Sequence, residues 1–122
     1  MTISHEKLRK IWDSRVFPSL FGSAQPSDHP VFLNVGGQPG AGKTQGAEDA
    51  ARLLHPDETF VTIDLDALRE YHPDYKSLVG NQDLSAMMGM THQFARQLTD
   101  WALAYARDNK ISFIYEETLW SP

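Results

Sequence analysis

The sequence predicts an α/β fold, a three-layer domain in which helices cover both faces of a parallel sheet. Three short runs rich in β-branched and aromatic residues alternate with two longer segments whose apolar residues recur every three or four positions. Strand, helix, strand, helix, strand is the order typical of parallel strands joined by crossover helices. The 122 residues fit one such domain, which is large enough to fold around its own hydrophobic core.

The first element expected along the chain is an amphipathic helix over residues 4–17. Its apolar stripe has helical spacing and consists of Leu8, Ile11, Trp12 and Val16. We expect Pro18 to end this helix, because proline lacks the backbone N–H that continues the helical ladder. Residues 23–30, which are rich in proline and serine, then form a linker to the sheet.

Three strands are expected, at residues 31–35, 59–63 and 111–115. The helix between the first two begins near Gly42 and stops before Pro56. We expect this helix to turn four residues inward: Ala47, Ala50, Ala51 and Leu54.

The second strand leads into a short helical turn that reaches Pro73, and residues 75–82 are expected to form a loop. The longest helix covers residues 84–109. Its apolar stripe consists of Met87, Met90, Phe94, Leu98, Trp101 and Tyr105. This spacing indicates core packing, without a cofactor role for the methionines and aromatic residues.

Composition and charge exclude several classes of function. The absence of cysteine excludes a disulfide framework, a thiolate metal site and a cysteine nucleophile. The net charge of −5 comes without a basic cluster, so we expect no binding to a nucleic acid polymer. The polar N-terminus and the absence of a long apolar run predict no membrane association and a cytoplasmic location.

A glycine-rich segment directly after the first strand carries the strongest chemical signal. It fits the phosphate-loop spacing G-x-x-x-x-G-K-[ST] with Gly37, Gln38, Pro39, Gly40, Ala41, Gly42, Lys43 and Thr44. Bare backbone lets successive N–H groups curl around phosphates, and the N-terminus of the following helix adds partial positive charge. Lys43 is then expected at the terminal phosphates of ATP, and the Thr44 hydroxyl on Mg²⁺.

Polar residues follow the other two strands. Alternation would place Asp64 and Asp66 on one face at the carboxyl end of the second strand, where open α/β sheets bind ligands. A carboxylate there could deprotonate an acceptor hydroxyl, although Asp66 could instead cap the turn beginning at Ala67. Glu116 and Thr118 end the third strand and could bind Mg²⁺ water or a substrate hydroxyl, or form a solvated loop.

These motifs together resemble the zeta toxin family of P-loop kinases, the toxins of epsilon-zeta and Pez toxin–antitoxin systems. The resemblance rests on GGQPGAGKT, on IDLDALREYHPDY and on the E-x-T at the end of a strand. It implies a P-loop kinase fold that uses ATP and Mg²⁺ to phosphorylate the sugar 3-hydroxyl of UDP-N-acetylglucosamine, and an antitoxin as partner.

The resemblance also assigns roles by position. Lys43 and Thr44 would serve ATP and the metal, and Asp66 would be the catalytic base. Asp100 falls where the family has a sugar-binding glutamate, and Glu116 and Thr118 match the pair that holds the sugar nucleotide. The sequence departs from the usual E-G-T of the family at Glu117, which leaves the acceptor open.

The family pattern continues beyond residue 122 with further strands and a lid that carries arginines. We therefore expect residues 1–122 to be an incomplete single domain, with an N-terminal helix and linker over 1–29 and a nucleotide-binding core over 30–118. Alone it is expected to be inactive. A P-loop kinase for another acceptor and a non-catalytic module that binds nucleotide or antitoxin are the alternatives. The first strand would form an exposed edge, through which the chain could self-associate.

Overall fold

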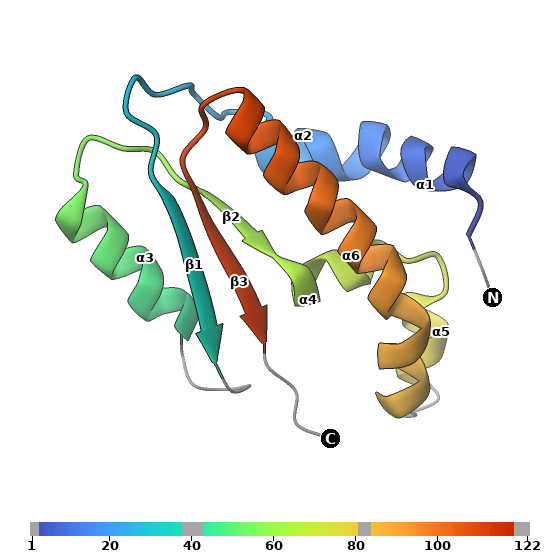
Figure 1. Cartoon of the computed structure of the whole chain (residues 1–122). Coiled ribbons are helices and arrows are strands. Elements are labelled where there is room, and N and C mark those ends of the chain that lie inside the picture. Colours follow the sequence, from blue (N-terminus) through green and yellow to red (C-terminus); the bar gives the residue numbers. More distant parts are fainter. Residues whose placement is uncertain (1–2, 38–42, 81–83, 119–122) are drawn as a thin grey trace.

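The sheet is the centre of the fold, and the computed structural model shows it within residues 3–37, 43–80 and 84–118, which the structure describes. Its strands β1 (Phe32–Gly37), β2 (Val61–Asp64) and β3 (Phe113–Thr118) are all parallel, in the order β1-β3-β2. Figure 1 shows β3 between the other two. The three expected strands and their parallel arrangement are confirmed.

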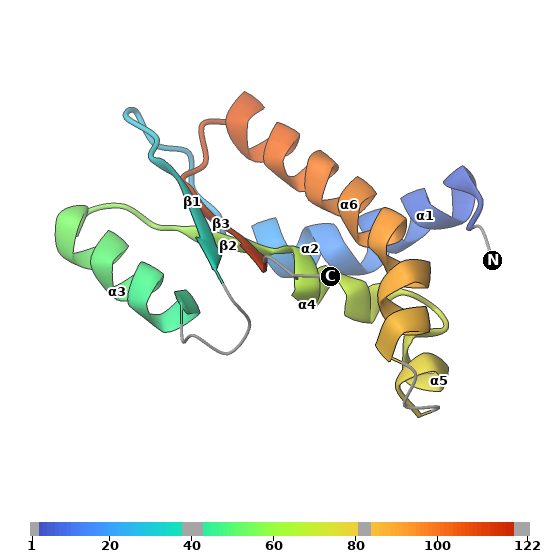
Figure 2. The same ribbon diagram turned by 60° about the horizontal axis from the view of Figure 1, so that its bottom comes forward.

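Helices cover both faces of the sheet, as predicted. Helix α3 (Lys43–Leu54) lies on one face, and α6 (Leu84–Asp108) lies on the other together with the N-terminal helices (Figure 2). The main core lies between the sheet and α6, where Leu98, Phe113 and Ile63 have no accessible surface. No helix in the described ranges has the length and apolar content needed to cross a membrane.

The N-terminal helical segment does not end at Pro18, so that expectation is wrong. Helix α1 (His5–Ile11) continues into a π-helical turn at Trp12–Val16 and then into α2 (Phe17–Phe21). The N–H of Phe17 donates to the carbonyl of Trp12, five residues back, and Pro18 then lies in the first turn of α2. Because of this wider turn, Pro18 lies in the first turn of a helix, where a residue without a backbone N–H is tolerated.

Aromatic packing holds this N-terminal segment against α6. The Trp12 ring meets the Trp101 ring edge to face, with centroids 5.8 Å apart, and Phe17 meets Tyr105 in the same way at 4.9 Å. Trp12 and Val16 are buried, and both belong to the same core cluster as the inner face of α6. The predicted stripes of both helices therefore pack against each other.

Helix α3 buries less of its surface than the sequence predicts. Ala51 is fully buried, but Ala50 is exposed, and Leu53 and Leu54 are 83% and 72% exposed. The expectation that Ala50 and Leu54 turn inward is wrong, because only a narrow stripe of α3 meets the sheet at β1 and β3. An apolar surface therefore remains open on this helix.

The connection from β2 to α6 is more helical than expected. Helix α4 (Leu65–Leu68) and a 3₁₀ turn (Arg69–Tyr71) form the predicted short helical turn, but α5 (Tyr75–Gly80) replaces the expected loop. The N–H of Leu78 donates to the carbonyl of Asp74, and α5 packs against α6. A helix this short is too brief to show a periodic pattern in the sequence, which is why it was missed.

The open edge of β1 predicts self-association. Among the described residues β1 pairs with β3 alone, and Phe32 on this edge is 43% exposed. An apolar strand edge pairs readily with a second chain. We expect light scattering to report a mass above that of the monomer, and Phe32→Lys to lower it. Val79→Lys is the control, since Val79 is as exposed at 45% but lies on α5. An equal effect of both variants would contradict the edge contact.

A buried histidine predicts a loss of stability in mild acid. His72 is 4% exposed, its Nδ1 accepts from the N–H of Asp74, and burial lowers its pKa below 6.5 although the charge of Asp74 opposes this. The unfolded chain therefore binds a proton first, and stability falls as the pH drops through 6.5 toward the folded pKa, by about 1.4 kcal/mol per unit of pKa difference.

Melting temperatures between pH 7.5 and 5 measure this effect. His72→Gln should flatten the dependence on pH, whereas His29→Gln, at an exposed site, should not. Glu58 does not interfere, because hydrogen bonds from Ser112 and Ser27 lower its pKa below 4.5 and so outside this range. An unchanged pH dependence in His72→Gln would show that other groups cause it.

Candidate functional site

The carboxyl ends of the three strands meet at one edge of the sheet, which we call the carboxyl edge. In the parallel register Gly37 lies opposite Thr118, and Asp64 lies opposite Glu116. The predicted site residues at the ends of the three strands are therefore neighbours. Ligands of open α/β sheets bind at this edge.

The described elements on either side of the phosphate-loop motif are a strand and a helix, as expected. Strand β1 ends at Gly37 and α3 begins at Lys43, so a strand leads into the motif and a helix leads out of it. The predicted residues Gln38, Pro39, Gly40, Ala41 and Gly42 lie outside the described residues, as do the side chains of Lys43 and Thr44. The described backbone thus has the connectivity that the motif requires.

The positions of Asp64 and Asp66 at the end of β2 differ from both sequence-based interpretations. The strand ends at Asp64, whose Oδ1 accepts the N–H of Asp66 and caps α4. Asp66 lies in the first turn of that helix, so strand alternation does not place the two aspartates on one face. Asp66 is not the cap either, because Asp64 has that role. The carboxylate of Asp66 is therefore available for other contacts.

Arg69 holds the carboxylate of Asp66. Its Nε donates to Oδ1 of Asp66 at 3.1 Å, and the Arg69 side chain is 6% exposed whereas that of Asp66 is 31% exposed. The guanidinium also donates through Nη1 to the carbonyl of Met88 and to Oγ1 of Thr91, both at 3.0 Å. The sequence analysis did not identify this contact between Arg69 and Asp66. The spacing of three residues on a helical turn is the signal that could have revealed it.

Glu116 is a buried carboxyl group that has no hydrogen-bond partner among the described residues. It is 1% exposed, and neither of its side-chain oxygens forms a hydrogen bond within the described residues. It shares the α3 face of the sheet with Thr62, whose hydroxyl donates to Glu48 of α3. Burying a carboxyl group without hydrogen bonds lowers the stability of the fold by roughly several kcal/mol. A ligand that donates hydrogen bonds to the group can offset this cost. Glu116 is thus the strongest structural sign of a binding site.

Glu117, the departure from the family pattern, points to the opposite face. Its carboxylate accepts from the Tyr115 hydroxyl at 3.1 Å and lies 3.8 Å from Nη1 of Arg96 on α6. Burial, followed by the charge of Glu117, raises the pKa of Tyr115 above 10 and keeps the phenol protonated as a donor. The side chain at this position therefore does not crowd Glu116.

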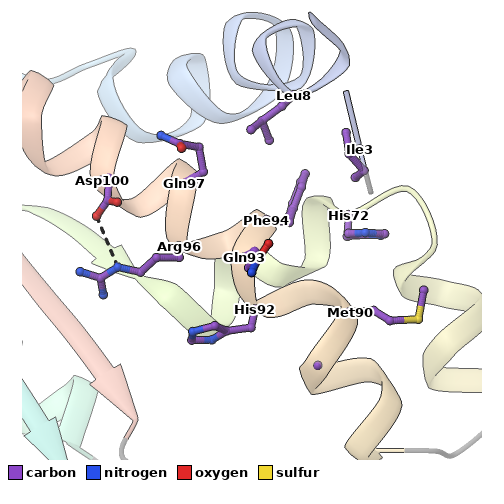
Figure 3. Close-up of a pocket in the computed structure, with 11 residues that line it drawn as sticks. Ile3, Leu8, His72, Met90, His92, Gln93, Phe94, Arg96, Gln97 and Asp100 are labelled. Carbon is purple, nitrogen blue, oxygen red and sulfur yellow. Dashed lines mark ion pairs between the residues drawn. The ribbon is translucent and has the colours of Figure 1, made fainter. Parts of the chain in front are cut away.

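Asp100 is connected to Glu117 through Arg96, which contacts both carboxylates. Nε of Arg96 lies 3.4 Å from Oδ1 of Asp100, and both side chains are about half exposed. Figure 3 shows this ion pair at one end of a cavity of about 800 Å³, with Phe94 and His72 farther along its lining. The contact was missed, although its spacing of four residues on a helix could have revealed it.

One helix thus holds together the two parts of the candidate site. Thr91 of α6 fixes Arg69 and, through it, Asp66. Arg96, one and a half turns later on the same helix, connects Asp100 to the end of β3.

The residues at the carboxyl edge fit a nucleotide-bound Mg²⁺. No three His, Cys, Asp or Glu side chains in the described ranges could hold a metal by themselves. Mg²⁺ does not require such a set, because it keeps several waters and binds one or two protein groups together with phosphates. Thr44, the predicted metal ligand, carries a hydroxyl oxygen of the type it prefers, and Asp64 adds a carboxylate at the same edge.

Comparisons with known proteins identify the fold and the family of this chain. A search of curated proteins found no match. A solved structure from the PezAT chromosomal toxin–antitoxin system of Streptococcus pneumoniae matches with a TM-score of 0.80 and 24% identity. The match covers 97% of this chain and 48% of that one, so this chain spans about half the length of the relative and shares its fold. The expected P-loop kinase fold is thus confirmed. The sequence profile described as Zeta toxin matches residues 19–122, and the chain therefore belongs to the zeta toxin family.

Proposed function

We propose that this chain is the core of an ATP-dependent kinase that phosphorylates the sugar 3-hydroxyl of UDP-N-acetylglucosamine. The observation that carries the proposal is Glu116, a buried carboxyl group at the carboxyl edge to which none of the described residues donates a hydrogen bond. A sugar offers hydroxyl groups that can donate to both of its oxygens. Membership of the zeta toxin family and the connectivity around the phosphate-loop motif support the same proposal.

ATP binds through the motif between β1 and α3. Backbone N–H groups of residues 38–42 surround its phosphates, and the N-terminus of α3 contributes partial positive charge. Lys43 contacts the terminal phosphates, and the Thr44 hydroxyl holds Mg²⁺. Bound there, the metal neutralises part of the charge on the phosphates during transfer.

Asp66 is the general base of the reaction. It accepts the proton of the acceptor hydroxyl as the hydroxyl oxygen bonds to the γ-phosphorus of ATP and the bond from that phosphorus to the ADP oxygen breaks. The carboxylate suits this task, because it is 31% exposed and its orientation is held by Arg69. Most of the remaining catalysis comes from positioning and positive charge.

The acceptor is held from two elements. Glu116 and Thr118 contact it from the end of β3, and Asp100 contacts it from α6. Asp100 and Glu117 both contact Arg96, so Asp100 lies near the carboxyl end of β3. The sugar nucleotide therefore binds between the carboxyl edge and α6.

A kinase for a different hydroxylated acceptor is the second candidate. One observation favours it: Asp100 already pairs with Arg96, which also contacts Glu117, the residue at the glycine position of the family. A carboxylate that is already paired with arginine presents less negative charge to an acceptor than a free one. The phosphate loop reads only the nucleotide, so the acceptor depends on these other groups.

An antitoxin protein is the proposed macromolecular partner, and the cytoplasm the proposed location. The solved structure that this chain resembles comes from a toxin–antitoxin system. A kinase that consumes a precursor of the cell wall requires an inhibitor in the cell that makes it. A module that binds nucleotide or antitoxin without catalysis is the remaining alternative.

Calorimetric titration with ATP–Mg²⁺ and with UDP-N-acetylglucosamine tests the proposal. Binding of both ligands supports the sugar-nucleotide kinase. Binding of ATP–Mg²⁺ alone favours another acceptor or a non-catalytic module, and binding of neither leaves the antitoxin-binding module.

The phosphate loop predicts a specific loss of ATP affinity. Lys43→Ala removes a charge-assisted contact worth about 1.5–3 kcal/mol, which corresponds to roughly a tenfold to hundredfold weaker Kd for ATP–Mg²⁺. Lys76→Ala removes an exposed lysine of α5 and is the matched control. Equal Kd values for the two variants would contradict the role of Lys43.

The orphan carboxyl predicts an unusual pair of effects. Glu116→Gln should weaken binding of UDP-N-acetylglucosamine by roughly tenfold, because the amide nitrogen cannot accept from a sugar hydroxyl and a buried polar group left unsatisfied costs about 1–3 kcal/mol. The melting temperature should stay the same or rise, since the substitution removes a buried carboxyl group whose oxygens accept no hydrogen bond from the described residues.

Glu117→Gln is the matched control, because Glu117 is the next residue of β3 and its side chain lies on the opposite face of the sheet. Its partner Arg96 is 45% exposed, so the loss of this surface ion pair should change affinity by less than about fivefold. A larger loss in Glu117→Gln than in Glu116→Gln would show that Glu116 is not the residue of β3 that holds the acceptor.

A further inference from the structure

We infer that Arg69 positions the catalytic base: it occupies one carboxylate oxygen of Asp66 and leaves the other to accept the proton. The inference rests on the proposed function, because it takes Asp66 as the base. It adds a positioning residue to the site and identifies which oxygen of Asp66 faces the acceptor.

The contact between the two side chains separates the two oxygens of Asp66. Nε of Arg69 donates to Oδ1 at 3.1 Å, and no hydrogen bond to Oδ2 is found among the described residues. Since the Asp66 side chain is 31% exposed and the Arg69 side chain only 6%, Asp66 retains access to a ligand on the side away from the guanidinium. Oδ2 is therefore the proton acceptor.

Arg69 cannot follow Asp66 if the carboxylate rotates, because the guanidinium is fixed at its other end. Nη1 donates to the carbonyl of Met88 and to the hydroxyl of Thr91, and Nη2 lies 3.4 Å from Nδ1 of His92. The guanidinium is a rigid planar fork, so these contacts with α6 also set the direction of its Nε–H.

The backbone of Asp66 is fixed as well. Oδ1 of Asp64 accepts the N–H of Asp66 at 3.0 Å, which sets the start of α4. The carboxylate is thus held between the cap of α4 and an arginine anchored on α6. Small displacements of a catalytic group cause large losses of rate, so this double restraint has a functional consequence.

A purely structural arginine would connect α4 to α6 in the same way. It would not respond to the acceptor, and its loss would affect both ligands alike through stability. The response of the Arg69 Nε–H to the acceptor and the selectivity of the loss therefore distinguish positioning from structural support.

The test measures the Nε–Hε signal of Arg69 by NMR as UDP-N-acetylglucosamine is added to the whole chain. We expect the signal to shift with the acceptor and the shift to disappear in Asp66→Asn. Arg69→Lys and Thr91→Val should each weaken acceptor binding by roughly threefold to tenfold, with the Kd for ATP–Mg²⁺ unchanged within about twofold. All titrations use a temperature at which circular dichroism shows every variant folded.

Arg9→Lys is the matched control, because Nε of Arg9 in α1 also pairs with an aspartate Oδ1, that of the exposed Asp13 in the π-helical turn. It should leave both Kd values unchanged. If Asp66→Asn weakens acceptor binding but the Arg69 signal does not shift, or if Arg69→Lys weakens both ligands equally, the positioning role is overturned while the base assignment remains. If Asp66→Asn binds the acceptor as tightly as the parent chain, Asp66 does not contact the acceptor and the positioning role is overturned. If the parent chain does not bind the acceptor at all, the proposed function fails and the positioning role fails with it.

Discussion

The pairing of β3 on both of its sides is the constraint on which the rest of the structure depends. Its parallel register with β1 and β2 brings Gly37, Asp64 and Thr118 to one edge of the sheet. Alternation along β3 then sends Glu116 to the face of α3 and Glu117 to the face of α6. Two adjacent residues of β3 therefore face opposite sides of the sheet. Glu116 faces the side covered by α3, and Glu117 faces the side covered by α6, which carries Arg96.

The sequence was sufficient for the main elements of the fold, because each had a clear period or a clear boundary. The stripe around Leu98 predicted α6, and the apolar runs predicted the strands. Pro18 was misread because a π-helical turn, which no local pattern indicates, lets the helix continue. Leu54 was misread because its exposure depends on how much of α3 meets the sheet, which is a property of tertiary packing.

The candidate site was predicted as a set of residue types more successfully than as a set of contacts. Spacing identified the phosphate loop, and the strand ends identified Asp66 and Glu116 as candidates. The pattern did not show that Asp64 caps α4, because the strand had been expected to continue to Asp66. Nor could it show that Arg69 reaches Thr91, twenty-two residues away, since that contact depends on how α4 packs against α6.

The two acidic residues at the centre of the site have environments that suit different tasks. Asp66 is partly exposed and has one oxygen held by a buried guanidinium, so a defined oxygen faces outward at little energetic cost. Glu116 is buried and lacks a partner among the described residues, so its hydrogen-bonding capacity is unused until a ligand supplies donors. The first arrangement favours accepting a proton in a fixed direction, and the second favours binding hydroxyl groups. Since Asp64, two residues before Asp66, lies opposite Glu116 in the parallel register, the fold places the proposed base and the proposed binding carboxyl at one edge of the sheet.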